Sequence, residues 1–241
     1  MEVLLLRFDA PLMSFGDVIV DQHNVTDRFP RLSLLTGLFA NALDYRHGDV
    51  EALEALQARI EFAVRWDVEP TALVDYHTVD LGQPKMAGAG WTTRGVPEHR
   101  EGGDAKFGTH QRYRHYWANG VMTVAATLLG TETPTVETLA AALREPARPL
   151  FLGRKTCLPA APLLRGVMKA ADVLAALRAT PAETDPVRGI ATALSACWPA
   201  HLGLDLPGRV VAVYDRRDWR NQIHTGRRLR REGLLLIGEV T

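Results

Sequence analysis

Cysteine is scarce in this chain: Cys157 and Cys197 are the only two among 241 residues. Two cysteines cannot build a disulfide framework, and a four-ligand zinc site would need several histidines beside them. Long apolar runs are also missing, since a membrane-spanning helix needs about 20 apolar residues and the first run covers only residues 3–6, which is also too short for a signal peptide. We therefore expect a reduced, cytoplasmic protein without a membrane partner.

Net charge is absent as well, because 28 Lys and Arg balance 28 Asp and Glu. This balance excludes a histone-like, globally basic protein, although a local basic patch can still bind nucleic acid. The glycine motifs that bind nucleotide phosphates do not occur in the sequence. His110 and His115 stand at the wrong spacing for two metal ligands on one helix face. We expect no cofactor, no metal and no small-molecule substrate.

The zero balance hides a strong charge asymmetry. Residues 49–80 hold eight acids and two bases, net −6, whereas residues 209–231 hold eight arginines and two acids, net +6. Residues 85–117 combine six bases and three acids with three histidines and five aromatic rings. Such a mixture suits single-stranded RNA, because guanidinium groups pair with phosphates and flat rings stack on unpaired bases. A solvated loop explains residues 85–117 equally well, and a solvated face explains residues 209–231 better.

Hydrophobic periodicity predicts alternating strands and helices. Seven glycines break every period across residues 81–111, which indicates a long loop or an extended hairpin arm. We expect strands at residues 3–8, 60–66, 72–79, 111–117 and 121–129, the last two paired through the turn Ala118-Asn119-Gly120. We expect helices after the caps Ser33, Asp49 and Thr135, and at residues 169–178 and 187–198. Three further strands are expected at residues 209–214, 222–230 and 234–240.

This order of elements predicts an α+β fold of two parts. Residues 1–150 fit the βαββαβ plan of ferredoxin-like and RNA-recognition-motif domains, if residues 150–152 supply a last short strand. The arm at about 81–111 is inserted into this domain. Residues 151–241 form a smaller, β-rich C-terminal unit.

Four stretches together resemble one family. They are residues 5–16 (LLRFDAPLMSFG), 28–43 (RFPRLSLLTGLFANAL), 111–124 (QRYRHYWANGVMTV) and 149–159 (PLFLGRKTCLP). In this order they resemble the CRISPR-associated, RAMP-type subunits of type I-E Cascade that bind the 5′ handle of the crRNA. The resemblance implies a ferredoxin-like domain with a long β-hairpin thumb, which the arm would form, and a smaller β-rich part. It also implies a non-catalytic, antiviral role: capping one end of the complex by holding the crRNA 5′ handle.

The resemblance implies partners too. These are the crRNA 5′ handle, the Cascade backbone subunits that coat the spacer and the large subunit that reads the target, so that target DNA is met only through the complex. Matched motifs and basic composition together nominate ten RNA-binding residues. They are Ser14, Arg28, Arg31, Ser33, Arg94, Lys106, His110, Arg112, Arg154 and Lys155. Ser33 would open a helix whose first amides offer a phosphate seat, although a plain N-cap is the simpler explanation for it.

Two other classes of function stay open at this point. Some relatives of the family cut repeat RNA without metal, so a metal-independent endoribonuclease is the alternative. Its candidate residues are Lys106, His110, Tyr113, His115 and Tyr45, but the adjacent Lys-His pair that the cutting relatives use does not occur in the sequence. The third class is a pure protein-interaction subunit whose charge is incidental.

Overall fold

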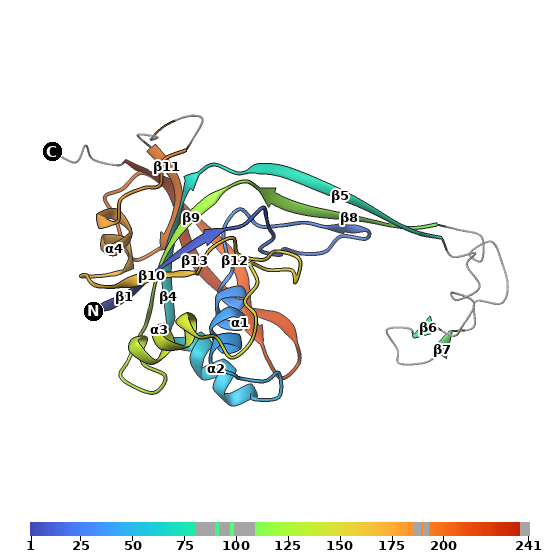
Figure 1. Ribbon diagram of the computed structural model, residues 1–241, viewed down its shortest axis with the longest axis horizontal. Helices are drawn as coiled ribbons and strands as arrows, with labels where there is room; N and C mark the ends of the chain where they lie inside the picture. Colours follow the sequence, from blue (N-terminus) through green and yellow to red (C-terminus); the bar gives the residue numbers. More distant parts are fainter. Residues whose placement is uncertain (81–89, 92–96, 99–108, 186–188, 190–192, 237–241) are drawn as a thin grey trace.

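The computed structural model describes residues 1–80, 90–91, 97–98, 109–185, 189 and 193–236 of the chain. The fold is mixed α+β, with a seven-stranded antiparallel sheet as its central layer (Figure 1). The strands follow the order β10-β1-β9-β4-β11-β13-β12. Their bounds are β1 (Glu2–Asp9), β4 (Ile60–Val68), β9 (Val121–Leu128), β10 (Leu164–Lys169), β11 (Ala193–Pro199), β12 (Arg209–Asp218) and β13 (Ile223–Leu236).

The two faces of this sheet belong to different hydrophobic clusters, because successive side chains of a strand point to opposite sides. On β1, Leu4 and Leu6 pack in the larger cluster with three helices, whereas Val3 packs in the smaller cluster with the fourth helix. The three helices of the larger cluster are α1 (Leu32–Ala42), α2 (Val50–Arg59) and α3 (Val136–Arg144), and the fourth is α4 (Val173–Ala179).

A second, four-stranded sheet carries the base of an arm. Strand β8 (Thr109–Ala118) is antiparallel to β5 (Thr71–Asp80) and β2 (Leu12–Met13) and parallel to β3 (His23–Asn24). Figure 1 shows β5 and β8 running side by side away from the central sheet. Strands β6 (Gly90–Trp91) and β7 (Pro97–Glu98) pair with each other. The rest of the expected arm, residues 81–89, 92–96 and 99–108, lies outside the described residues.

The expected hairpin between residues 111–117 and 121–129 is wrong. Strand β8 pairs with β5, whereas β9 pairs with β1 and β4. Asn119 does adopt the positive φ of 57° that favours a turn. A Cβ on Gly120, however, would lie 2.6 Å from the Trp66 ring and 2.7 Å from Cβ of Pro70. Asn119 and Gly120 therefore join two strands of different sheets, and glycine is needed because another segment packs against it.

The helix expected at residues 187–198 is wrong as well, since residues 193–199 form strand β11 between β4 and β13. The apolar residues Leu194, Cys197 and Trp198 mimic a helical period. On the strand all three are buried, and the two faces lie in different clusters: Trp198 packs in the smaller cluster and Cys197 in the larger one. A strand that is buried on both sides loses the alternation that would have identified it.

The helix expected from the Ser33 cap begins earlier, because Arg31 is the N-cap residue of α1 and makes no side-chain cap hydrogen bond. Thr135 is confirmed as a cap, since its side chain accepts a hydrogen bond from the amide of Thr138. The helix expected at 169–178 begins only at Val173, where Asp172 is the cap. The strands expected at 222–230 and 234–240 are a single strand, β13, up to Leu236.

The last strand of the first half is also displaced from its expected place. Residues 150–152 are not a strand, and the edge strand next to β1 is instead β10 at Leu164–Lys169. Strands from both sides of residue 150 therefore share one sheet. The division into units 1–150 and 151–241 stays a prediction.

Candidate nucleic-acid interface

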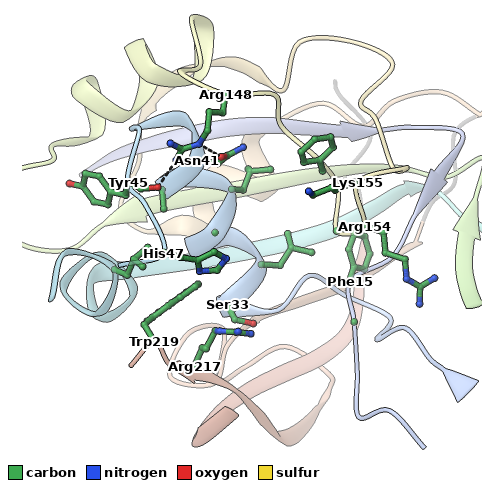
Figure 2. Close-up of a pocket in the computed structure, with 18 of the residues that line it drawn as sticks. Phe15, Ser33, Asn41, Tyr45, His47, Arg148, Arg154, Lys155, Arg217 and Trp219 are labelled. Atoms are coloured by element: carbon green, nitrogen blue, oxygen red, sulfur yellow. Dashed lines mark hydrogen bonds between the residues drawn. The ribbon is translucent and has the colours of Figure 1, made fainter. Parts of the chain in front are cut away.

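An open cleft of about 730 Å³ lies along α1. Five cationic side chains line it, and none of the described residues that line it is Asp or Glu. Figure 2 shows Phe15, Arg154 and Lys155 on one side of the helix and His47, Trp219 and Arg217 on the other. The cations are Arg46, Arg148, Arg154, Lys155 and Arg217, and the rings are Phe15, Tyr45, His47, Phe151 and Trp219. The cleft therefore combines positive charge with flat side chains.

The first turn of α1 is held by the C-terminal ribbon formed by β12 and β13. The backbone amide of Leu32 donates to Oδ2 of Asp215 at 3.0 Å. Asp215 is fully buried and also pairs with Arg228 at 2.6 Å. This first amide is thus already bonded, so the expectation of an empty phosphate seat is wrong for it. Ser33, in the same turn, lies 3.1 Å from Nε2 of His224 and lines the cleft.

Arg217 is placed in the cleft by bonds to its backbone. The side chain of buried Gln57 donates to the Arg217 carbonyl at 2.9 Å and accepts from the Arg217 amide at 3.0 Å. The Arg217 guanidinium lies 5.3 Å from the ring centroid of Trp219, a cation–π contact. Its Nη2 donates to the neutral side chain of Gln222. Among the described residues Arg217 has no ion pair with an acid, so its guanidinium is available beside the cleft.

The opposite wall is a tight loop at residues 152–157. Gly153 has φ of 106°, and a Cβ there would lie 1.6 Å from the carbonyl oxygen of Ser14, so this position requires glycine. The Ser14 amide donates to the Leu152 carbonyl at 3.1 Å, which joins the loop to the N-terminal segment. Arg154 donates to the carbonyls of His115 at 3.1 Å and Asn24 at 2.8 Å. Lys155 next to it is exposed.

Arg148 holds the third wall, the loop after α1. It donates to Asn41 at 2.6 Å, to Asp44 and to the carbonyl of Tyr45. These three contacts leave the neighbouring Arg46 and His47 exposed at the cleft. In the described part of the chain neither Arg46 nor Lys155 has an ion pair. The two are therefore available to an anionic ligand.

Of the ten nominated residues, the structure brings Ser14, Ser33, Arg154 and Lys155 together in this cleft. Arg31 is only 9% exposed and forms ion pairs with Asp17 and Asp27. Arg28 is committed to three side chains, pairing with Glu69 and lying over the rings of Trp66 and Trp117. Both arginines thus have internal partners, and their role in RNA binding stays a prediction.

The remaining nominated residues belong to the arm. His110 and Arg112 line a small hollow of about 350 Å³ with Asp21, and Arg112 donates to the Asp21 carbonyl at 3.2 Å. Arg94 and Lys106 lie outside the described residues. The structure therefore separates the nominated residues into a cleft group and an arm group.

Sequence reasoning missed several residues of the cleft as binding candidates: Arg46, His47, Arg148, Arg217 and Trp219. Arg217-Asp-Trp219 carries the same interleaving of arginine and ring that drew attention to residues 85–117, so this signal was available. The expectation of a solvated face at 209–231 is wrong for Arg230, which is 3% exposed and paired with Asp27 and Glu232.

The catalytic candidates that the structure describes do not converge on one point, and Lys106 lies outside the described residues. The ring of Tyr113 stacks on His23 at 4.7 Å, and the His115 ring lies 5.9 Å from the same histidine. Tyr45 lies in the cleft instead. Within the described residues no group of three or more His, Cys, Asp or Glu could hold a metal ion. No helix among those residues is long and apolar enough to cross a membrane.

Comparison with known proteins identifies the family. The family model described as CRISPR-associated protein (Cas_Cas5) matches residues 3–231. The chain belongs to this family. Over 182 residues it is 32% identical to the CRISPR system Cascade subunit CasD of Escherichia coli (strain K12), covering 72% of this chain and 75% of the relative. The resemblance inferred from the four stretches is therefore confirmed.

Solved structures of similar fold agree with the Cas_Cas5 assignment. A chain of a CRISPR RNA-guided surveillance complex superposes with a TM-score of 0.68 at 28% identity, covering 98% of this chain and 90% of that one. A second structure, a Cas protein, gives a TM-score of 0.63 over 98% of this chain and 95% of its own length. At 23% identity this second match shows the fold alone.

Proposed function

We propose that this Cas_Cas5 protein is a non-catalytic, RNA-binding subunit of a type I-E CRISPR surveillance complex, Cascade, and that it holds the 5′ handle of the crRNA. The observation that carries the proposal is the cleft along α1, with its five cations, its rings and no acid among the described lining residues. The family membership and the identity to CasD support the same role. In it the chain caps one end of the complex and serves antiviral defence.

The chemistry of the cleft fits an unpaired RNA segment. Lys155 and Arg46 offer charges that no acid of the described residues pairs with, and Arg217 offers a guanidinium beside the ring of Trp219. Phosphates pair with such groups, while unstacked bases gain contact with flat side chains. A duplex would present its phosphates but could not place its paired bases against the rings. The handle is therefore expected to enter as a single strand.

The partners follow from this role. The crRNA is the direct ligand, the backbone subunits and the large subunit of Cascade are the protein neighbours, and target DNA is met only through the assembled complex. Because the crRNA is bound inside the cell in this role, we propose that the subunit is cytoplasmic.

We further propose that α1, α3 and the strands β10-β1-β9-β4 are the ferredoxin-like core, because this order is the one a βαββαβ chain adopts when both helices cover one face.

Binding of labelled handle RNA to the purified protein in EDTA tests the proposal. We expect tight binding of the RNA without its cleavage, and weaker binding when Lys155→Ala and Arg217→Ala are combined. Arg178→Ala is the matched control, since Arg178 is exposed on α4, across the sheet from the cleft. Specific cleavage in EDTA would favour the endoribonuclease instead. Failure to bind at low salt would favour a protein-interaction subunit.

A further inference from the structure

Gly37 stands in the middle of α1, on the side that lines the cleft. A glycine inside a helix destabilises it by about 0.5–1 kcal/mol relative to alanine, because glycine loses more backbone freedom on folding. The presence of glycine at this position therefore needs an explanation, either in how the helix packs or in a ligand that lies against it.

The fold supplies no packing reason for Gly37. A Cβ built on it meets no heavy atom within 4 Å among the described residues, and its φ lies outside the left-handed region. Gly120 and Gly153 differ, because a Cβ at either position would collide with another segment at 2.6 Å or less. Alanine would therefore fit at position 37 in the free protein.

We infer that the bare backbone at Gly37 is the floor against which one unpaired nucleotide of the RNA packs. The inference rests on the proposed function and extends it to a residue that carries no charge. Leu34 and Leu38 line the cleft beside Gly37, so the floor is apolar, whereas Arg217 and Lys155 line the walls. A nucleotide lying there has its base or sugar on the helix and its phosphates toward the two cations.

The cleft is large enough to take a nucleotide. Its volume of about 730 Å³ lies within the roughly 300–1,000 Å³ typical of sites that enclose a small ligand. Attractive contact between flat rings and a helix surface requires carbon atoms at about 3.5–4 Å. A methyl group at position 37 would take up the space in which those ring atoms lie.

The test substitutes Gly37 with residues that favour a helix. Gly37→Ala should weaken binding of the handle RNA about tenfold, a loss comparable to that of one stacked base, and Gly37→Leu should weaken it further. The melting temperature of Gly37→Ala should equal or exceed that of the parent, because alanine is the better helix former. Gly166→Ala is the matched control: a Cβ there also meets nothing within 4 Å, and the position, in β10, is not part of the cleft.

The outcomes separate this inference from the function on which it rests. Parent-like affinity of Gly37→Ala and Gly37→Leu, together with weakened binding by Arg217→Ala, would overturn the inference and leave the RNA-binding role intact. Absence of binding by the parent protein would overturn both. Weakened binding by the two Gly37 variants and not by Gly166→Ala, with the melting temperature of Gly37→Ala maintained, supports the nucleotide floor.

Discussion

The carboxylate of Asp215 in β12 accepts a hydrogen bond from the backbone amide of Leu32, the first residue of α1, at 3.0 Å. The two residues are 183 positions apart in the chain. A distant strand thus does what a local cap residue usually does for a helix. Because α1 is the floor of the cleft, the C-terminal ribbon both supports this floor and contributes Arg217 and Trp219 to the wall.

Removal of this carboxylate should destabilise the whole protein. Asp215 is fully buried and pairs with Arg228, whose side chain is 19% exposed. Asp215→Ala leaves that guanidinium without its partner and the Leu32 amide without its acceptor, so we expect a loss of about 3–5 kcal/mol in the free energy of unfolding. Asp215→Asn retains an acceptor and should lose less. Urea unfolding measures both, with exposed Asp205→Ala as control, and equal stability of all three variants would contradict the capping role.

Salt dependence should count the phosphate contacts of the cleft. Each phosphate contact on single-stranded RNA contributes about −0.7 to the slope of log K against log salt. Lys155→Ala and Arg46→Ala should each make this slope shallower by about that amount, because neither cation has an ion pair within the described residues. Arg178→Ala should leave it unchanged. Unchanged slopes in both cleft variants would mean that the phosphates lie elsewhere, for example along the arm.

Much of the fold was predictable from local patterns. The strand expected at residues 3–8 has a short, mostly apolar sequence and is observed at Glu2–Asp9. Thr135 is a good cap before a periodic helix, and that helix is observed as well. Both elements could therefore be predicted from local sequence. The failures have one cause: the partner that decides the structure is remote. The sequence of β11 has a helical period, but the residues form a strand because they pair with β4 and β13. Ser33 is not the cap of α1, whose first amide is instead bonded by a carboxylate from β12.

The cleft could be predicted only in part for the same reason. Ser14, Ser33 and Lys155 stand in stretches that matched the family, and the match nominated them. Arg46 and Arg217 are brought to the cleft by Arg148 and Gln57, whose contacts span the chain and leave no mark on sequence spacing. A search for arginine interleaved with rings over the whole chain would have found Arg217, because Trp219 follows it.

Neither thiol should react in the folded protein. Burial raises the pKa of Cys197 to about 12, and burial also raises the pKa of Cys157. At pH 8 both therefore stay protonated, and the thiolate is the reactive form. A disulfide exchange reagent should find no thiol in the native state and both free cysteines after unfolding. Rapid reaction of Cys157 in native protein would show that the loop at residues 152–157 opens.

His224 should make RNA binding depend on pH. Burial, then the charges of Arg217 and Arg31, lower the pKa of His224 from its ordinary value of 6.5, against a smaller opposite effect of Asp215. In the free protein the ring is therefore neutral at pH 7. A phosphate beside Arg217 and Ser33 would favour the imidazolium, because its negative charge offsets the two arginines, and so would raise the pKa of His224 in the complex.

The sign of the effect follows from that shift. Binding takes up a proton, so the gain in affinity is complete below the lowered pKa of the free protein and is lost as the pH rises through the pKa of the complex. Folding stability responds separately: it falls as the pH drops from 6.5 through the lowered pKa, because the unfolded chain binds the proton more readily.

Titrating RNA affinity between about pH 5 and 8, the range in which histidines change charge, measures the pH dependence of RNA binding. His224→Gln should remove it, whereas His47→Gln, in the loop after α1, should leave the His224 part in place. An identical pH profile in parent and His224→Gln would mean that no phosphate lies beside this histidine.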